Sequence, residues 1–116
     1  DDGGFLKLAP TLQSTGDPDI FAAGDCAALA DPRPKAGVFA VRAGPPLAWN
    51  LRRRALGAAT KPWSPQRSHL ALISTGDRHA IASRGRFAIE GDWVWRWKDR
   101  IDRGFMAKYR DPADRR

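Results

Sequence analysis

The chain has 116 residues, of which 42% are hydrophobic and 28% are charged, as is typical of one ordinary globular domain. This composition excludes a disordered tail, a fibrous repeat and a complete multidomain enzyme. No apolar run approaches the roughly 18 residues that span a bilayer, and residues 1–20 lack the basic leader and apolar stretch of a signal peptide. Because Cys26 is the single cysteine, we expect a cytoplasmic protein without a disulfide or zinc site.

The net charge of +7 is divided unevenly along the chain. Residues 1–51 hold four basic and six acidic side chains, whereas residues 52–116 hold sixteen basic and seven acidic ones. A basic surface attracts phosphates, nucleic acid or anionic lipid headgroups, although it does not define a fold. The charge pattern therefore indicates two regions of different kinds.

Residues 4–8 predict a short strand, and the polar residues 13–19 predict a loop. The apolar run at 20–23 does not alternate, which predicts a strand covered on both faces in a parallel sheet. Gly24 and Asp25 end this strand, and an acidic residue there can accept a hydrogen bond from a sugar hydroxyl. A plain turn with an N-cap aspartate remains the alternative. A helix over residues 26–30 would add amides for a phosphate.

The composition of residues 36–56 predicts a helix whose spacing buries one face. That face consists of Val38, Val41, Leu47, Leu51 and Ala55. Because proline removes a helical donor, Pro45 and Pro46 predict two pieces, 36–43 and 46–56, or a strong kink. The arginines at 52–54 then fall in the last turn before Gly57, where positive charge suits the helix dipole; a ligand for the triplet is the alternative.

The second half has a different periodicity. Residues 57–67 contain the prolines of a linker, and three short apolar segments follow at 70–74, 79–83 and 86–89. Because glycine-containing turns separate these segments, they predict an antiparallel meander, which needs a covering layer.

Residues 93–110 predict a basic amphipathic helix that supplies this layer. Its apolar residues recur at intervals of four, and its candidate docking residues are Trp93, Trp97, Arg100, Ile101 and Phe105. One interpretation is that the aromatic stripe caps the meander. A second is an interfacial helix with tryptophans at headgroup level and basic residues on anionic lipid. A nucleic-acid or protein partner is the third.

The chain offers few residues for catalysis. His69 and His79 have no carboxylate or cysteine at metal-ligand spacing. The sequence also has no Walker loop, no three-glycine dinucleotide fingerprint and no recognisable catalytic triad. We therefore expect no metal site and no catalytic residue.

Two motifs nevertheless resemble a known family. Residues 15–25, Thr-Gly-Asp-Pro-Asp-Ile-Phe-Ala-Ala-Gly-Asp, resemble the second FAD fingerprint of the pyridine nucleotide-disulfide oxidoreductase superfamily. Residues 34–44 and 47–51 are similar to its flavin-facing helix, which ends in an Ala-x-Asn-Leu-like element. The motifs occur in the family's order and spacing. Gly16 in place of Ser or Thr, Arg42 in place of Gln, and the Pro45-Pro46 pair depart from the pattern.

The resemblance implies that Asp25 binds the ribityl hydroxyls of FAD. The amides after it, from Cys26, would approach the pyrophosphate, and those of Gly37 and Val38 would lie near the pyrimidine edge of the flavin. The cofactor-binding residues implied in this way are Gly24, Asp25, Cys26, Ala36, Gly37 and Val38.

The second half is similar to particular members of the superfamily. It lacks the His-x-x-Pro-Thr motif of the disulfide reductases, which speaks against a thiol role. A meander followed by an amphipathic helix resembles type II NADH dehydrogenases and sulfide:quinone reductases. Residues 72–77 and 95–103 more closely resemble NADH dehydrogenase-like flavoproteins sometimes fused to selenide, water dikinase.

The fold class expected from this resemblance is α/β, and the fragment given by this chain is of the α+β kind. The end of a Rossmann-like FAD-binding domain at 1–56 precedes a linker at 57–67, and a meander with its basic helix occupies 68–116. The implied function is a C-terminal part of an FAD-dependent NAD(P)H oxidoreductase. The alternative is a non-enzymatic basic module that binds an anionic membrane or nucleic acid.

Several partners are implied together with this function. They are the upstream FAD- and NAD(P)H-binding part of the parent, and a quinone or the inner face of the membrane; nucleic acid is the less favoured partner. An exposed strand edge also predicts a homo-oligomer.

Overall fold

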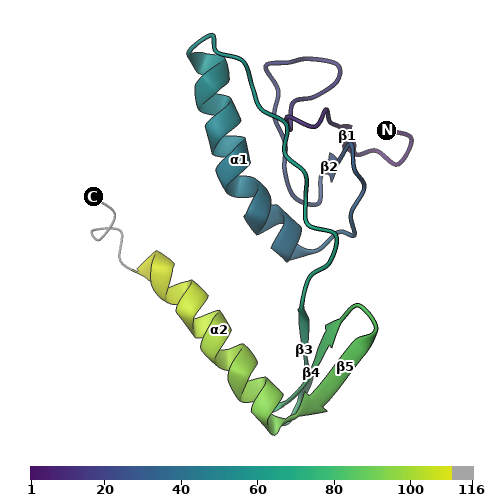
Figure 1. The fold of residues 1–116 in the computed structure, drawn as a ribbon, viewed down its shortest axis with the longest axis vertical. Coiled ribbons are helices and arrows are strands. Elements are labelled where there is room, and N and C mark those ends of the chain that lie inside the picture. Colours follow the sequence, from purple (N-terminus) through teal and green to yellow (C-terminus); the bar gives the residue numbers. More distant parts are fainter. Residues whose placement is uncertain (111–116) are drawn as a thin grey trace. The chain divides into compact units, whose positions relative to one another are not determined.

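The structure, a computed structural model, describes residues 1–110 (Figure 1). The chain divides into two units, Asp1–Arg67 and Ser68–Arg116. Residues 111–116, which the expected C-terminal region includes, lie outside the described residues. Between residues 1 and 110 the elements follow the order β1, β2, α1, β3, β4, β5, α2. The expected mixture of helix and strand, with a three-stranded antiparallel sheet and a C-terminal helix, is confirmed.

The first unit contains little regular sheet. Strand β1 (Leu6–Lys7) pairs in parallel with β2 (Ala27–Ala28). The amide of Leu6 donates to the carbonyl of Cys26 at 2.9 Å, and the amide of Leu8 donates to that of Ala28 at 3.0 Å. The short strand expected at 4–8 is therefore present, as two residues.

The strand predicted at residues 20–23 was wrong. The parallel strand lies at β2 instead, so the helix considered over residues 26–30 does not form. The apolar run at 20–23 forms only an isolated antiparallel bridge, between Phe21 and Gln13. Ile20 is 47% exposed and only Ala22 of this run is buried, so the run is not covered on both faces. Within this run Ala22 joins the core and Ala23 packs against it, without a strand.

Helix α1 (Gly37–Ala55) is continuous in Figure 1, with Pro45 and Pro46 inside it. The expected division into pieces at 36–43 and 46–56 was therefore wrong. The buried side chains lie on both sides of the pair, Phe39 and Ala43 before it and Asn50 after it. These contacts hold both halves of the helix in place, so tertiary packing overrides the missing donors.

The buried face of α1 also differs from the expected one. Val41 and Leu51 are exposed, whereas Leu47 is partly buried against the core. The core of the first unit consists of Leu8, Leu12, Ala22, Ala27 and Ala43, with Ala23, Leu29, Leu47 and Trp63 packed against it.

The C-terminus of α1 agrees with the prediction from its arginine triplet. Gly57 has a φ of 68°, its amide donates to the carbonyl of Arg54, and the amide of Ala58 donates to that of Arg53. These two bonds form a Schellman motif, which satisfies carbonyls at the helix end.

Residues 57–67, the expected linker, fall within the first unit. Asn50 is 1% exposed and binds this segment. Its Nδ2 donates to the carbonyls of Thr11 at 2.9 Å and Lys61 at 2.8 Å, and its Oδ1 accepts from the amide of Lys61 at 2.9 Å. The amide of Trp63 donates to the carbonyl of Pro10 at 2.9 Å. The segment is thus part of the packing of this unit.

The second unit contains the predicted meander. Strands β3 (Ala71–Gly76), β4 (His79–Arg84) and β5 (Phe87–Gly91) form one antiparallel sheet in that order. Asp77 and Arg78 join β3 to β4 with φ values of 47° and 56°, as a type I′ turn requires. The short strands and their turns are therefore confirmed.

Helix α2 (Asp92–Arg110) begins directly after β5 and packs on the sheet only at its start. Val94 is fully buried against Ala80 and Ala82, and Leu72 and Trp95 pack around them. Beyond this contact, the helix extends past the sheet (Figure 1). Val94 and Trp95 make the core contact with the sheet, whereas Trp93, Trp97, Ile101 and Phe105 of the aromatic stripe are 38–51% exposed, which does not favour the interpretation that the stripe caps the meander.

Candidate functional site

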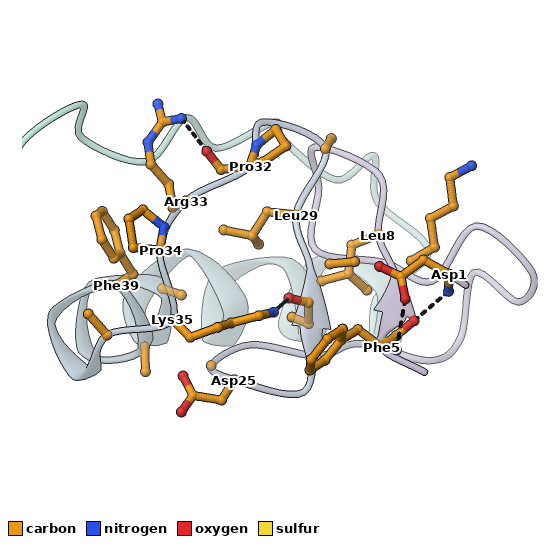
Figure 2. A pocket seen from close by; sticks show the side chains of 18 of the residues that line it. Asp1, Phe5, Leu8, Asp25, Leu29, Pro32, Arg33, Pro34, Lys35 and Phe39 are labelled. Carbon is orange, nitrogen blue, oxygen red and sulfur yellow. Dashed lines mark hydrogen bonds between the residues drawn. The ribbon is translucent and has the colours of Figure 1, made fainter. Parts of the chain in front are cut away.

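The first unit contains a cavity of about 470 Å³, which we call the β1–α1 cavity. Its walls come from residues 1–8, from residues 24–36 and from the first turns of α1 (Figure 2). The volume lies within the range of about 300–1,000 Å³ that small-molecule sites occupy. The cavity therefore has the size of a ligand site.

Three of the six expected cofactor-binding residues line this cavity. They are Gly24 and Asp25, from the turn before β2, and Ala36, which precedes α1. Cys26, Gly37 and Val38 are not among the lining residues, and Cys26 is exposed. The fold thus brings together the two sequence motifs, although not every residue predicted within them.

The turn at Gly24 has a backbone that favours glycine. Its φ is +80°, a left-handed value that L side chains rarely adopt, and a Cβ there would lie 3.5 Å from the Cβ of Ala40. The next residue, Asp25, lines the cavity with a carboxylate. A carboxylate accepts hydrogen bonds from hydroxyl groups, so this wall suits a hydroxyl-bearing ligand.

Lys35 carries a positive charge to the same cavity. Its Nζ donates a hydrogen bond to the carbonyl of Ala27 on β2 and lies 4.1 Å from the centre of the Phe5 ring (Figure 2). The carbonyl and the face of the ring both attract the ammonium. These two contacts fix its position.

Arg33, also at the cavity, is fully occupied by protein groups. Its Nη1 and Nη2 donate to the two carboxylate oxygens of Asp31 at 2.6 and 2.7 Å. Its remaining bonds go to the carbonyls of Pro32, Pro65 and Gln66. The hydrogen bond from Arg33 lowers the pKa of Asp31 from its ordinary value. Arg33 therefore holds the loop at residues 31–33 against residues 65–66.

The five expected docking residues of α2 are all exposed. Trp93 is 51% exposed, Trp97 39%, Ile101 43% and Phe105 38%, and Arg100 is exposed beside them. Two ion pairs at i, i+4 spacing, between Lys98 and Asp102 and between Arg103 and Asp99, lie along the same helix. The helix thus presents an apolar face to solvent.

Sequence reasoning did not single out Phe5, Arg33 or Lys35 as site residues. Lys35 lies directly before Ala36, within the second motif, and that position was the only signal for it. Its partner Phe5 comes from a segment that is distant in sequence, and its partner Ala27 lies eight residues before it. A contact of this kind leaves no periodic pattern.

Other chemistry is limited in the described part of the chain. Between residues 1 and 110, no group of three or more His, Cys, Asp or Glu side chains could hold a metal ion. His79 Nδ1 lies 3.0 Å from the hydroxyl of Thr75. Neither described helix is both long and apolar enough to cross a membrane.

No protein-family model matches the chain, and no curated protein matches it.

Proposed function

We propose that the β1–α1 cavity is part of an FAD site. In this proposal the first unit is the end of a Rossmann-like FAD-binding domain, and the chain is a C-terminal part of an FAD-dependent NAD(P)H oxidoreductase. The supporting observation is that Gly24 and Asp25, from one motif, line the same cavity as Ala36, from the other. The resemblance assigns both motifs to the flavin.

The lining residues fit a part of this cofactor. Asp25 supplies an acceptor for a polyhydroxyl chain, and Gly24 leaves the turn beside it without a side chain. When bound, FAD would supply the hydride and electron chemistry, and the protein would supply binding and orientation. The upstream segments that the resemblance implies would complete the site and bring the nicotinamide. A quinone or another acceptor would then receive the electrons.

The test is the binding of FAD by the 116-residue chain, which the quenching of flavin fluorescence measures. We expect Asp25→Asn to weaken binding about tenfold, because a hydrogen bond to a charged group is lost. Asp17→Asn is the control, since Asp17 lies outside the cavity and an asparagine oxygen can keep its hydrogen bond from the amide of Asp19. Unchanged binding by Asp25→Asn would exclude the carboxylate from the site. In a longer chain with the upstream segments, the same change should reduce bound flavin and NAD(P)H oxidation together.

A second candidate function is favoured by the exposed face of α2. We propose that this face binds an anionic membrane surface from the cytoplasmic side. Trp93, Trp97, Ile101 and Phe105 recur every fourth residue on it. Tryptophans of such helices lie at headgroup level, and each basic residue near an anionic surface contributes about 1 kcal/mol.

Vesicle binding tests this candidate. The chain should bind vesicles that contain phosphatidylserine and not vesicles of phosphatidylcholine alone, and Trp97→Ala should weaken binding about tenfold through lost apolar burial. The control is Trp49→Ala, because Trp49 of the first unit is 51% exposed. An equal loss of vesicle binding in both variants would contradict a specific role of the α2 face. Equal binding of the chain to DNA would do the same, because general electrostatic attraction would then explain the binding.

A further inference from the structure

Lys35 differs from the other basic residue fixed at the cavity wall. Arginine has five N–H donors, and Arg33 gives five hydrogen bonds to Asp31, Pro32, Pro65 and Gln66. Its charge is balanced by the carboxylate of Asp31. Arg33 has no donor left for a ligand.

The ammonium of Lys35 keeps unused donors. A lysine has three N–H groups, and one hydrogen bond, to the carbonyl of Ala27, is formed here. None of the ion pairs formed within residues 1–110 includes Lys35. The Phe5 ring and the Ala27 carbonyl hold the charge in place, but neither neutralises it. The ammonium therefore lines the cavity as a positive charge without an ion-pair partner in the described part of the chain, and the carboxylates of Asp1, Asp2 and Asp25 line the same cavity.

Lys7 lines the same cavity without this fixation. Both lysines are exposed, but no contact within the described residues holds the ammonium of Lys7. Ordering such a side chain on a ligand costs rotamer entropy, and Lys35 has already lost part of that freedom.

From these contacts we infer that Lys35 is the anion-binding residue of the β1–α1 cavity and that it receives a phosphate or pyrophosphate group. With Asp25 on the same cavity, the ligand class is a phosphate ester that also carries hydroxyl groups. The inference rests on the proposed function only where FAD is taken as that ligand. It adds a residue that neither motif assigned to the cofactor.

Titration calorimetry on the 116-residue chain tests this role with two probes, inorganic pyrophosphate and FAD. Lys35→Met should weaken the binding of each about tenfold, because a charge-assisted hydrogen bond is lost. Lys35→Arg should keep most of the affinity, since charge and donors remain. Lys61→Met is the matched control, because Lys61 lies over the Trp49 ring and outside the cavity.

The probes separate the two proposals. Pyrophosphate binding that depends on Lys35, without FAD binding, supports the inference and contradicts the FAD site. FAD binding that Lys35→Met leaves unchanged contradicts the inference and keeps the FAD site. If neither probe binds the wild-type chain, both are overturned.

A measurement on the wild-type chain covers the case in which Lys35→Met does not fold. An amine-reactive reagent labels lysines, and mass spectrometry gives the rate at each position. Pyrophosphate should slow the labelling of Lys35 several-fold and leave that of Lys61 unchanged. Equal rates at Lys35 with and without pyrophosphate would overturn the inference.

Discussion

The contacts inside the first unit differ in kind from the contacts inside the second unit. The first unit has four strand residues in all within its described elements, and side chains donate to main-chain carbonyls of distant segments instead. Asn50, Arg33 and Lys35 each make such bonds. The second unit has a three-stranded ladder and a small core around Val94. A regular strand ladder therefore organises the second unit, whereas in the first unit polar side chains add to an apolar core and an irregular set of backbone bonds.

The strongest test of this contrast is Asn50→Ala. The change leaves the carbonyls of Thr11 and Lys61 and the amide of Lys61 without their partner, so the first unit should lose about 3 kcal/mol of stability. Hydrogen exchange measures each unit separately. The amides of Ala80 and Ala82 in the second unit should exchange as in the wild type. Equal loss of protection in both units would contradict the contrast.

A smaller effect is expected in the second unit from Val94→Ala. The fully buried valine joins α2 to β4, and the cavity left behind should cost about 2 kcal/mol. Hydrogen exchange of the β4 amides at increasing urea concentrations measures the loss in the second unit. Ile101→Ala on the exposed part of α2 is the control and should stay within about 0.5 kcal/mol. If the two variants lose the same stability, α2 is anchored along its length and not at its start.

The smallest expected effect is on the stability of the first unit at acid pH. Because the hydrogen bond from Arg33 lowers the pKa of Asp31 below its ordinary 3.8, the pair stabilises the first unit above that pH and stops doing so as pH falls through the folded value. Asp31→Asn should flatten the acid side of the pH profile of the first unit. An acid titration followed by hydrogen exchange gives the profile, and Asp77→Asn in the second unit should leave it unchanged. An unaltered profile in Asp31→Asn would exclude this pair as a source of acid sensitivity.

The same contrast explains what the sequence could predict. Alternation and turn residues are local, so the meander, the places of its turns and the end of α1 before Gly57 followed from short patterns. The apolar run at 20–23 wrongly predicted a strand, and the prolines of α1 wrongly predicted two helical pieces. Contacts with other segments decide the structure there.

The candidate site divides in the same way. Gly24, Asp25 and Ala36 were selected by motif and line one cavity. Lys35 and Phe5 became visible only when the fold placed them together, because 30 residues separate them in the sequence. Motifs identified the part of the site that has a fixed spacing, and they missed the part that depends on packing.

The bonds from Asn50, Arg33 and Lys35 to main-chain carbonyls also bear on how this sequence can diverge. Every residue type has a backbone carbonyl, so the positions that accept these bonds can change their side chains without losing them. These positions are Thr11, Ala27, Pro32, Lys61, Pro65 and Gln66. Only the donors are constrained. Related sequences should therefore keep the three donor positions while their acceptor positions drift, and pairwise covariation between the two sets should be absent.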